Sequence, residues 1–155
     1  MTVAEKLVAL LKAQGLTCAT AESCTGGGVG SAITAVPGSS SVFAGGIISY
    51  ANEVKRDVLG VAAQALDRFG AVSPEVAAQM AAGVRRLLKV DLAVSLTGIA
   101  GPDGGSEEKP VGLVWFGLAT KDGVRTEKAI FRGDRAKVRE QAVIHALGML
   151  TIAAT

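Results

Sequence analysis

The 155-residue chain is long enough for one domain with a substantial core, and we expect a single domain over residues 1–155. Its 49% hydrophobic and 19% charged residues exclude a disordered chain, and a net charge of +2 from scattered Lys and Arg residues predicts no nucleic-acid partner. The first residues do not resemble a signal peptide and no apolar run reaches membrane-spanning length, so we expect a soluble cytoplasmic protein without a membrane partner.

The first half of the chain alternates helices and strands around a glycine turn. Thr2 is placed to cap a helix that Gly15 would end. Periodicity and turn residues then predict a strand over 16–21, a helix over 29–36, a strand over 42–50, a short helix from Asn52 and another over 63–69.

The second half begins with a clear helix start at Ser73-Pro74-Glu75. The predicted buried face of that helix consists of Val76, Met80, Val84, Leu87 and Leu88. A strand over 92–96, a glycine-rich loop over 99–110, a hairpin of strands over 111–120 and 124–131, and a helix from Gly133-Asp134 follow. Alternating helices and strands plus one hairpin predict an α/β sandwich with a mixed sheet.

Ser23 and Cys24 follow the first predicted strand and precede glycines 26–28. The first N–H groups of a helix have no partner inside it, so they can hold an anion or a developing oxyanion near such a hydroxyl. The stretch lacks the spacing of a dinucleotide or phosphate loop. Ser23 is therefore a candidate nucleophile, and the plainer interpretation is an ordinary capping serine.

A serine nucleophile needs a neighbouring base. The single histidine, His145, falls inside the last helix, where a position at the edge of the core or in solvent is expected. Lys55 follows a strand end, and burial could lower its pKa enough to serve as a base, although spacing alone favours a solvated lysine. Tyr50 could assist Lys55 or be an ordinary strand-end aromatic. Thr97 ends a third strand, and these strand ends could surround one crevice if the strands are neighbours.

Four blocks of this sequence resemble the CinA C-terminal domain family. They are Ala21-Glu22-Ser23-Cys24-Thr25-Gly26-Gly27, Tyr50-Ala51-Asn52-Glu53-Val54-Lys55, the block from Thr97 to Gly105, and Gly133-Asp134-Arg135. The resemblance covers essentially the whole chain. It implies a three-layer α/β/α fold and, for stand-alone members, hydrolysis of nicotinamide mononucleotide to nicotinate mononucleotide and ammonia in pyridine nucleotide salvage.

The resemblance also implies roles for individual residues. Ser23 would be the nucleophile, Lys55 its base and Tyr50 an assistant. The expected contacts to the nucleotide substrate are Thr25, Gly26, Gly27, Asn52, Thr97, Gly98, Gly101, Gly104, Gly105 and Arg135. Backbone groups of the 101–105 loop and Arg135 could hold the phosphate, although Arg135 could instead pair with Asp134 or Glu107.

Neither the cysteine next to Ser23 nor the acidic residues of the glycine-rich loop are expected to take part in catalysis. Cys24, with no histidine close in the sequence, is expected to be a small buried thiol. Acidic residues of the 99–110 loop have no histidine beside them, so we expect no metal, and the amidase route needs no cofactor. The competing hypothesis is a module that binds a nucleotide or a protein without turnover. The apolar helix faces would permit a homo-oligomer.

Overall fold

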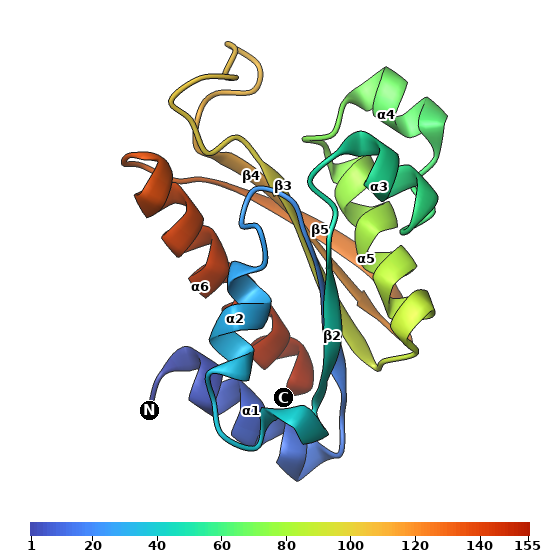
Figure 1. The fold of residues 1–155 in the computed structure, drawn as a ribbon, viewed down its shortest axis with the longest axis vertical. Coiled ribbons are helices and arrows are strands. Elements are labelled where there is room, and N and C mark those ends of the chain that lie inside the picture. Colours follow the sequence, from blue (N-terminus) through green and yellow to red (C-terminus); the bar gives the residue numbers. More distant parts are fainter.

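A five-stranded sheet lies between two layers of helices in the computed structural model, which describes residues 1–155 (Figure 1). The elements in chain order are α1 (Val3–Gln14), β1 (Cys18–Glu22), α2 (Gly28–Thr34), a 3-10 helix (Ser39–Ser41), β2 (Phe43–Ile48), α3 (Asn52–Asp57), α4 (Ala63–Phe69), α5 (Pro74–Leu88), β3 (Leu92–Gly98), β4 (Leu113–Thr120), β5 (Gly123–Ile130) and α6 (Arg135–Ala154). The 3-10 helix was not predicted, and the other elements agree with the predicted ones except for small shifts at their ends.

The strand order in the sheet is β2-β1-β3-β4-β5. Strand β1 pairs in parallel with both β2 and β3, whereas β4 is antiparallel to both β3 and β5. The predicted mixed sheet is therefore confirmed. Because β2, β1 and β3 are parallel neighbours, their carboxyl ends meet at one edge, which is where ligands bind in open α/β sheets.

Helices α1, α2 and α6 cover one face of the sheet, and α5 with the shorter α3 and α4 covers the other (Figure 1). Each face has its own apolar core, with 23 buried residues on the side of α6 and 12 on the side of α5. This arrangement confirms the three-layer α/β/α architecture. None of the helices combines the length and the apolar character needed to cross a membrane.

Local sequence signals place the helix ends. Thr2 and Glu5 form a complete capping box at α1, and Gly15 ends that helix with a left-handed backbone (φ 67°). Ser73 caps α5 by accepting the N–H of Val76. The prediction for Leu87 is wrong: it is 47% exposed, because it lies in the last turn of α5, beyond the buried residues of that helix.

Candidate active site

A cavity of about 290 Å³ opens at the carboxyl edge of the three parallel strands. The predicted site residues that line it are Ser23, Tyr50, Asn52, Lys55, Thr97, Gly98, Gly101, Gly104 and Arg135. They come from all four sequence blocks. The hypothesis that these loops surround one crevice is confirmed, because the central position of β1 brings the ends of β2 and β3 to either side of it.

Ser23 is the first residue after β1, and the sheet fixes its backbone. Its N–H donates to the carbonyl of Leu96 on β3 (3.0 Å), and its own carbonyl accepts the N–H of Gly26 (3.1 Å). Gly26 and Gly27 have φ angles of 59° and 100°, which favour glycine, and they turn the chain into α2. The turn therefore presents a mostly buried hydroxyl, 8% exposed as a residue, to the cavity.

Lys55 approaches Ser23 from α3, and it is almost fully buried, with 1% of its surface exposed. Its Nζ lies 3.1 Å from Ser23 Oγ, 2.7 Å from the carbonyl oxygen of Ser49 and 3.1 Å from that of Tyr50. The interpretation of Lys55 as an ordinary solvated lysine is therefore wrong. No carboxylate forms a salt bridge with this buried amine.

Burial lowers the pKa of Lys55 below its ordinary value of 10.5, because desolvation penalises the ammonium form. A neutral amine has two N–H groups and one lone pair. The carbonyls of Ser49 and Tyr50 can only accept, so they use the two N–H groups and leave the lone pair for the Ser23 hydroxyl. This arrangement suits an amine that takes a proton from Ser23.

Glu22 is a buried carboxylate that the sequence analysis did not single out. Its Oε1 accepts the hydroxyl of Thr25 (2.6 Å) and the N–H of Val29 (2.9 Å), and its Oε2 accepts the N–H of Gly30 (3.0 Å). The N-terminal N–H groups of α2 that were expected to hold an anion are thus partly occupied by the protein itself. An acid that reaches a helix N-terminus complements the positive end of the helix dipole, but Glu22 lies at the end of β1, before the whole glycine turn, so its place at α2 is set by the fold.

We expect Glu22→Gln to lower the free energy of unfolding by about 1.5–3 kcal/mol, the range for a lost hydrogen bond to a charged group. A glutamine amide has only one acceptor oxygen. In its place at the other position stands an NH₂ group, which cannot accept, so either the N–H of Gly30 or that of Val29 would lose its acceptor. Denaturant unfolding followed by circular dichroism measures the effect. The exposed Glu53→Gln is the control and should stay within about 0.5 kcal/mol. Equal stability of the two variants would contradict this role.

Two arginines of α6 brace the loops around the cavity. Arg135 donates to the carbonyl of Gly101 (2.8 Å) and to the hydroxyl of Tyr50 (3.4 Å), and it pairs with neither of the acids considered for it. Arg139 donates to the carbonyls of Cys24 (3.0 Å) and Thr25 (3.2 Å) and so holds the turn after Ser23. The sequence analysis missed Arg139, although its spacing of four residues places it on the same helix face as Arg135.

Four predicted substrate contacts do not line the cavity: Thr25, Gly26, Gly27 and Gly105. The Thr25 hydroxyl is bound to Glu22, and the N–H of Gly26 is bound within the turn. Gly27 faces the side chain of Ile48, and Gly105 packs closely on Val111. Glu22 and Arg139 of α6 close the turn around Thr25 and Gly26, and the side chains of Ile48 and Val111 cover Gly27 and Gly105.

The thiol of Cys24 is buried, as predicted, and desolvation raises its pKa to about 11. A thiol with this pKa is almost entirely protonated at neutral pH, so it is a poor nucleophile. Thr97 donates its hydroxyl to the carbonyl of Ala71 (2.8 Å) and thereby joins β3 to the segment before α5. Thr97 helps to build the cavity wall.

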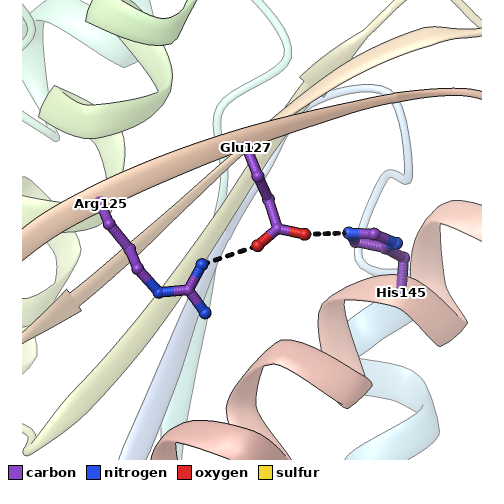
Figure 2. A network of polar contacts seen from close by, with 3 residues as sticks. All are labelled: Arg125, Glu127 and His145. Carbon is purple, nitrogen blue, oxygen red and sulfur yellow. Dashed lines mark hydrogen bonds and ion pairs between the residues drawn. The ribbon is translucent and has the colours of Figure 1, made fainter.

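His145 lies at the edge of the core, as predicted, and does not line the cavity. Its Nε2 is 2.7 Å from Oε2 of Glu127, whose other oxygen accepts from Arg125 at 2.7 Å (Figure 2). The imidazole also stacks on the ring of Phe116, with 4.3 Å between centroids. The single imidazole of the chain is therefore committed to a contact between α6 and β5, and Lys55 supplies the basic group within hydrogen-bond distance of Ser23 Oγ.

The fold and the cavity define an α/β protein with a buried serine–lysine pair at the carboxyl ends of parallel strands. Residues 1–153 match the model of the CinA C-terminal domain, and the chain belongs to this family. A solved structure, the competence/damage inducible protein CihA from Agrobacterium tumefaciens, superposes with a TM-score of 0.94 at 43% identity, covering 98% of this chain and 93% of that one.

Relatives of two lengths match the chain. It is 50% identical over 151 residues to the nicotinamide-nucleotide amidohydrolase PncC of Escherichia coli K12, covering 97% of this chain and 92% of that protein. It is 58% identical over 131 residues to a competence-damage inducible protein of Halothermothrix orenii, covering 84% of this chain. The chain spans only 32% of that longer protein.

Proposed function

We propose that this protein is a nicotinamide-nucleotide amidohydrolase that converts nicotinamide mononucleotide to nicotinate mononucleotide and ammonia, with Ser23 as nucleophile and Lys55 as its base. The observation that carries the mechanism is the 3.1 Å contact between Lys55 Nζ and Ser23 Oγ in the wall of the cavity, where Lys55 is only 1% exposed. The likeness to PncC over nearly the whole chain supports the substrate.

In the first half of the reaction, the neutral amine of Lys55 takes the proton of the Ser23 hydroxyl while Oγ attacks the carboxamide carbon. The tetrahedral intermediate collapses when the Lys55 ammonium gives its proton to the leaving nitrogen, which departs as ammonia. An ester between Ser23 and the nicotinoyl group remains. In the second half, Lys55 takes a proton from water as the resulting hydroxide attacks the ester. The Lys55 ammonium then returns that proton to the released Oγ, and the acid product loses its own proton to solvent and leaves as the carboxylate.

The oxyanion needs hydrogen-bond donors that the protein does not already use. The N–H of Cys24, directly after the nucleophile, donates to no other residue, and Cys24 lines the cavity. Its carbonyl is held by Arg139. We therefore assign the oxyanion to the N–H of Cys24 in preference to the helix donors of Val29 and Gly30, which are bound to Glu22.

The Tyr50 carbonyl orients Lys55, and the Tyr50 hydroxyl contacts Arg135. Tyr50 would therefore assist the reaction through its backbone carbonyl, which holds the amine of Lys55. Its hydroxyl would help to position Arg135, the residue that we propose binds the phosphate. The remaining N–H groups of Arg135 and the backbone of the loop that contains Gly101 and Gly104 would hold the phosphate. Asn52, on the same wall, can bond to the ribose hydroxyls.

The test is an assay of the purified protein with nicotinamide mononucleotide. We expect ammonia and nicotinate mononucleotide in equal amounts, and rapid acid quenching followed by mass spectrometry should find the nicotinoyl nucleotide on the peptide that contains Ser23. Tight binding of the substrate without any ammonia would favour the binding module instead. Hydrolysis without an adduct on Ser23, under conditions in which a burst of ammonia is seen, would contradict the acyl-enzyme.

A further inference from the structure

Arg139 lies on α6, outside the cavity, and its side chain reaches the turn that follows Ser23. Its Nε donates to the carbonyl of Cys24 (3.0 Å), and one of its terminal nitrogens donates to the carbonyl of Thr25 (3.2 Å). A guanidinium carries its N–H groups in a fixed planar fork, which lets one side chain hold two neighbouring carbonyls. Arg139 does not line the cavity, so it can affect the reaction only through this turn.

The carbonyl of Cys24 depends on Arg139 for its hydrogen bond. No backbone N–H donates to this carbonyl, whereas the preceding carbonyl, that of Ser23, accepts the N–H of Gly26 at 3.1 Å. The guanidinium is therefore the partner that the fold supplies to the Cys24 carbonyl. Without it, this carbonyl would have no hydrogen-bond donor within the protein.

The N–H of Cys24, which we assign to the oxyanion, lies between these two carbonyls in the chain. It belongs to the planar peptide that joins Ser23 to Cys24, and Gly26 holds the carbonyl of that peptide. Arg139 holds the next carbonyl and thereby fixes the other side of Cys24. An oxyanion donor is effective because it is already aimed when the negative charge develops. The direction of this N–H is therefore set by both contacts together.

The guanidinium also brings a positive charge to the turn. No carboxylate forms a salt bridge with Arg139. Burial raises the pKa of the Cys24 thiol, and the charge of Arg139 acts against that shift, as it would favour any negative charge that develops beside the turn. Arg139 is exposed as a residue, so water and salt screen its charge. The two hydrogen bonds to the backbone are therefore its main contribution.

Building on the proposed function, we infer that Arg139 is a positioning residue for catalysis, which aims the N–H of Cys24 at the oxyanion by holding the carbonyls of Cys24 and Thr25. The tetrahedral intermediates of acylation and deacylation both place a negative oxygen at this N–H, so both steps depend on Arg139. The unreacted substrate carries no such charge. Loss of the guanidinium should therefore lower kcat and leave the affinity for the substrate unchanged.

The experiment compares Arg139→Met with Lys137→Met, which replaces an exposed lysine of the same helix. Removal of an oxyanion donor costs about 10²–10³ in kcat, and a donor that is only misdirected costs less, so we expect Arg139→Met to lower kcat about 10–100-fold. The dissociation constant of nicotinamide mononucleotide, measured by calorimetry in a Ser23→Ala background, should not change. Lys137→Met should change neither quantity. Arg139→Lys keeps a cation without the planar fork, so its loss of kcat should be intermediate.

An aldehyde analogue of the substrate, with a formyl group in place of the carboxamide, separates positioning from a merely structural role. Ser23 Oγ adds to the aldehyde carbon while the hydroxyl proton passes to Lys55, and the adduct keeps its oxyanion because it has no leaving group. Arg139→Met should weaken binding of this analogue by the same factor as it lowers kcat. An unchanged kcat, or equal weakening of the analogue and of nicotinamide mononucleotide, would overturn the inference.

Product formation by the wild-type protein keeps this inference distinct from the proposed function. No hydrolysis of nicotinamide mononucleotide by the wild type defeats the proposed function, whereas hydrolysis at the wild-type rate by Arg139→Met defeats this inference alone. Thermal unfolding establishes that each variant is folded. If Arg139→Met does not fold, the same comparisons are made with Arg139→Lys, for which a kcat and an analogue affinity equal to those of the wild type would overturn the inference.

Discussion

Replacing Ser23 with alanine is expected to lower the rate of ammonia release about a thousandfold or more, without loss of substrate binding. The reason is that the variant lacks the hydroxyl that we propose forms the covalent intermediate. Its neighbour Cys24 has a thiol whose pKa burial raises to about 11, so thiolate is scarce at neutral pH. The measurement combines steady-state kinetics of ammonia release with calorimetric binding of nicotinamide mononucleotide.

Cys24→Ala is the matched control for this variant. Alanine keeps the backbone N–H that we assign to the oxyanion and removes only the sulfur, so covalent turnover should persist. If Ser23→Ala released ammonia at a rate near that of the wild type, Ser23 would not be the nucleophile. If Cys24→Ala lost the acyl-enzyme while Ser23→Ala kept it, the covalent role would pass to the thiol.

The architecture could be predicted from the sequence because its signals are local. The capping box at Thr2 and the Ser73-Pro74 helix start each depend on a few adjacent residues. The strand order is different, because it depends on which strands exchange backbone hydrogen bonds across long sequence distances. Only the structure shows that β1 lies between β2 and β3, and this order alone brings Ser23 to Lys55.

The electrostatic details of the site were predicted less well, for the same reason. A lysine after a strand end is typical of a surface, and nothing local says that the carbonyls of Ser49 and Tyr50 enclose the amine of Lys55. Likewise, the first N–H groups of a helix such as α2 are expected to be free to bind an anion. Here the Glu22 carboxylate already accepts those of Val29 and Gly30. Burial changes the pKa and the hydrogen-bond partners of residues such as Lys55 and Glu22, and burial depends on the whole fold and not on the adjacent sequence.

Replacing Lys55 with methionine is expected to lower kcat about 10²–10⁴-fold, the contribution of a positioned general base. Methionine keeps much of the side-chain length and fills the buried space, so circular dichroism and thermal unfolding should show a folded protein. Lys55→Arg separates a base from a mere positive charge. A guanidinium stays protonated at every accessible pH, so this variant should be as inactive as Lys55→Met.

The pH dependence of the wild-type enzyme gives an independent readout of the same residue. The active form of Lys55 is the neutral amine, so kcat/KM should fall as the pH decreases through the pKa of this residue. Because desolvation lowers that pKa from 10.5, the fall should occur at a lower pH than an ordinary lysine would give. The residual activity of Lys55→Met should lack this acid limb. Persistence of the same limb in that variant would assign it to another group and remove Lys55 as the base.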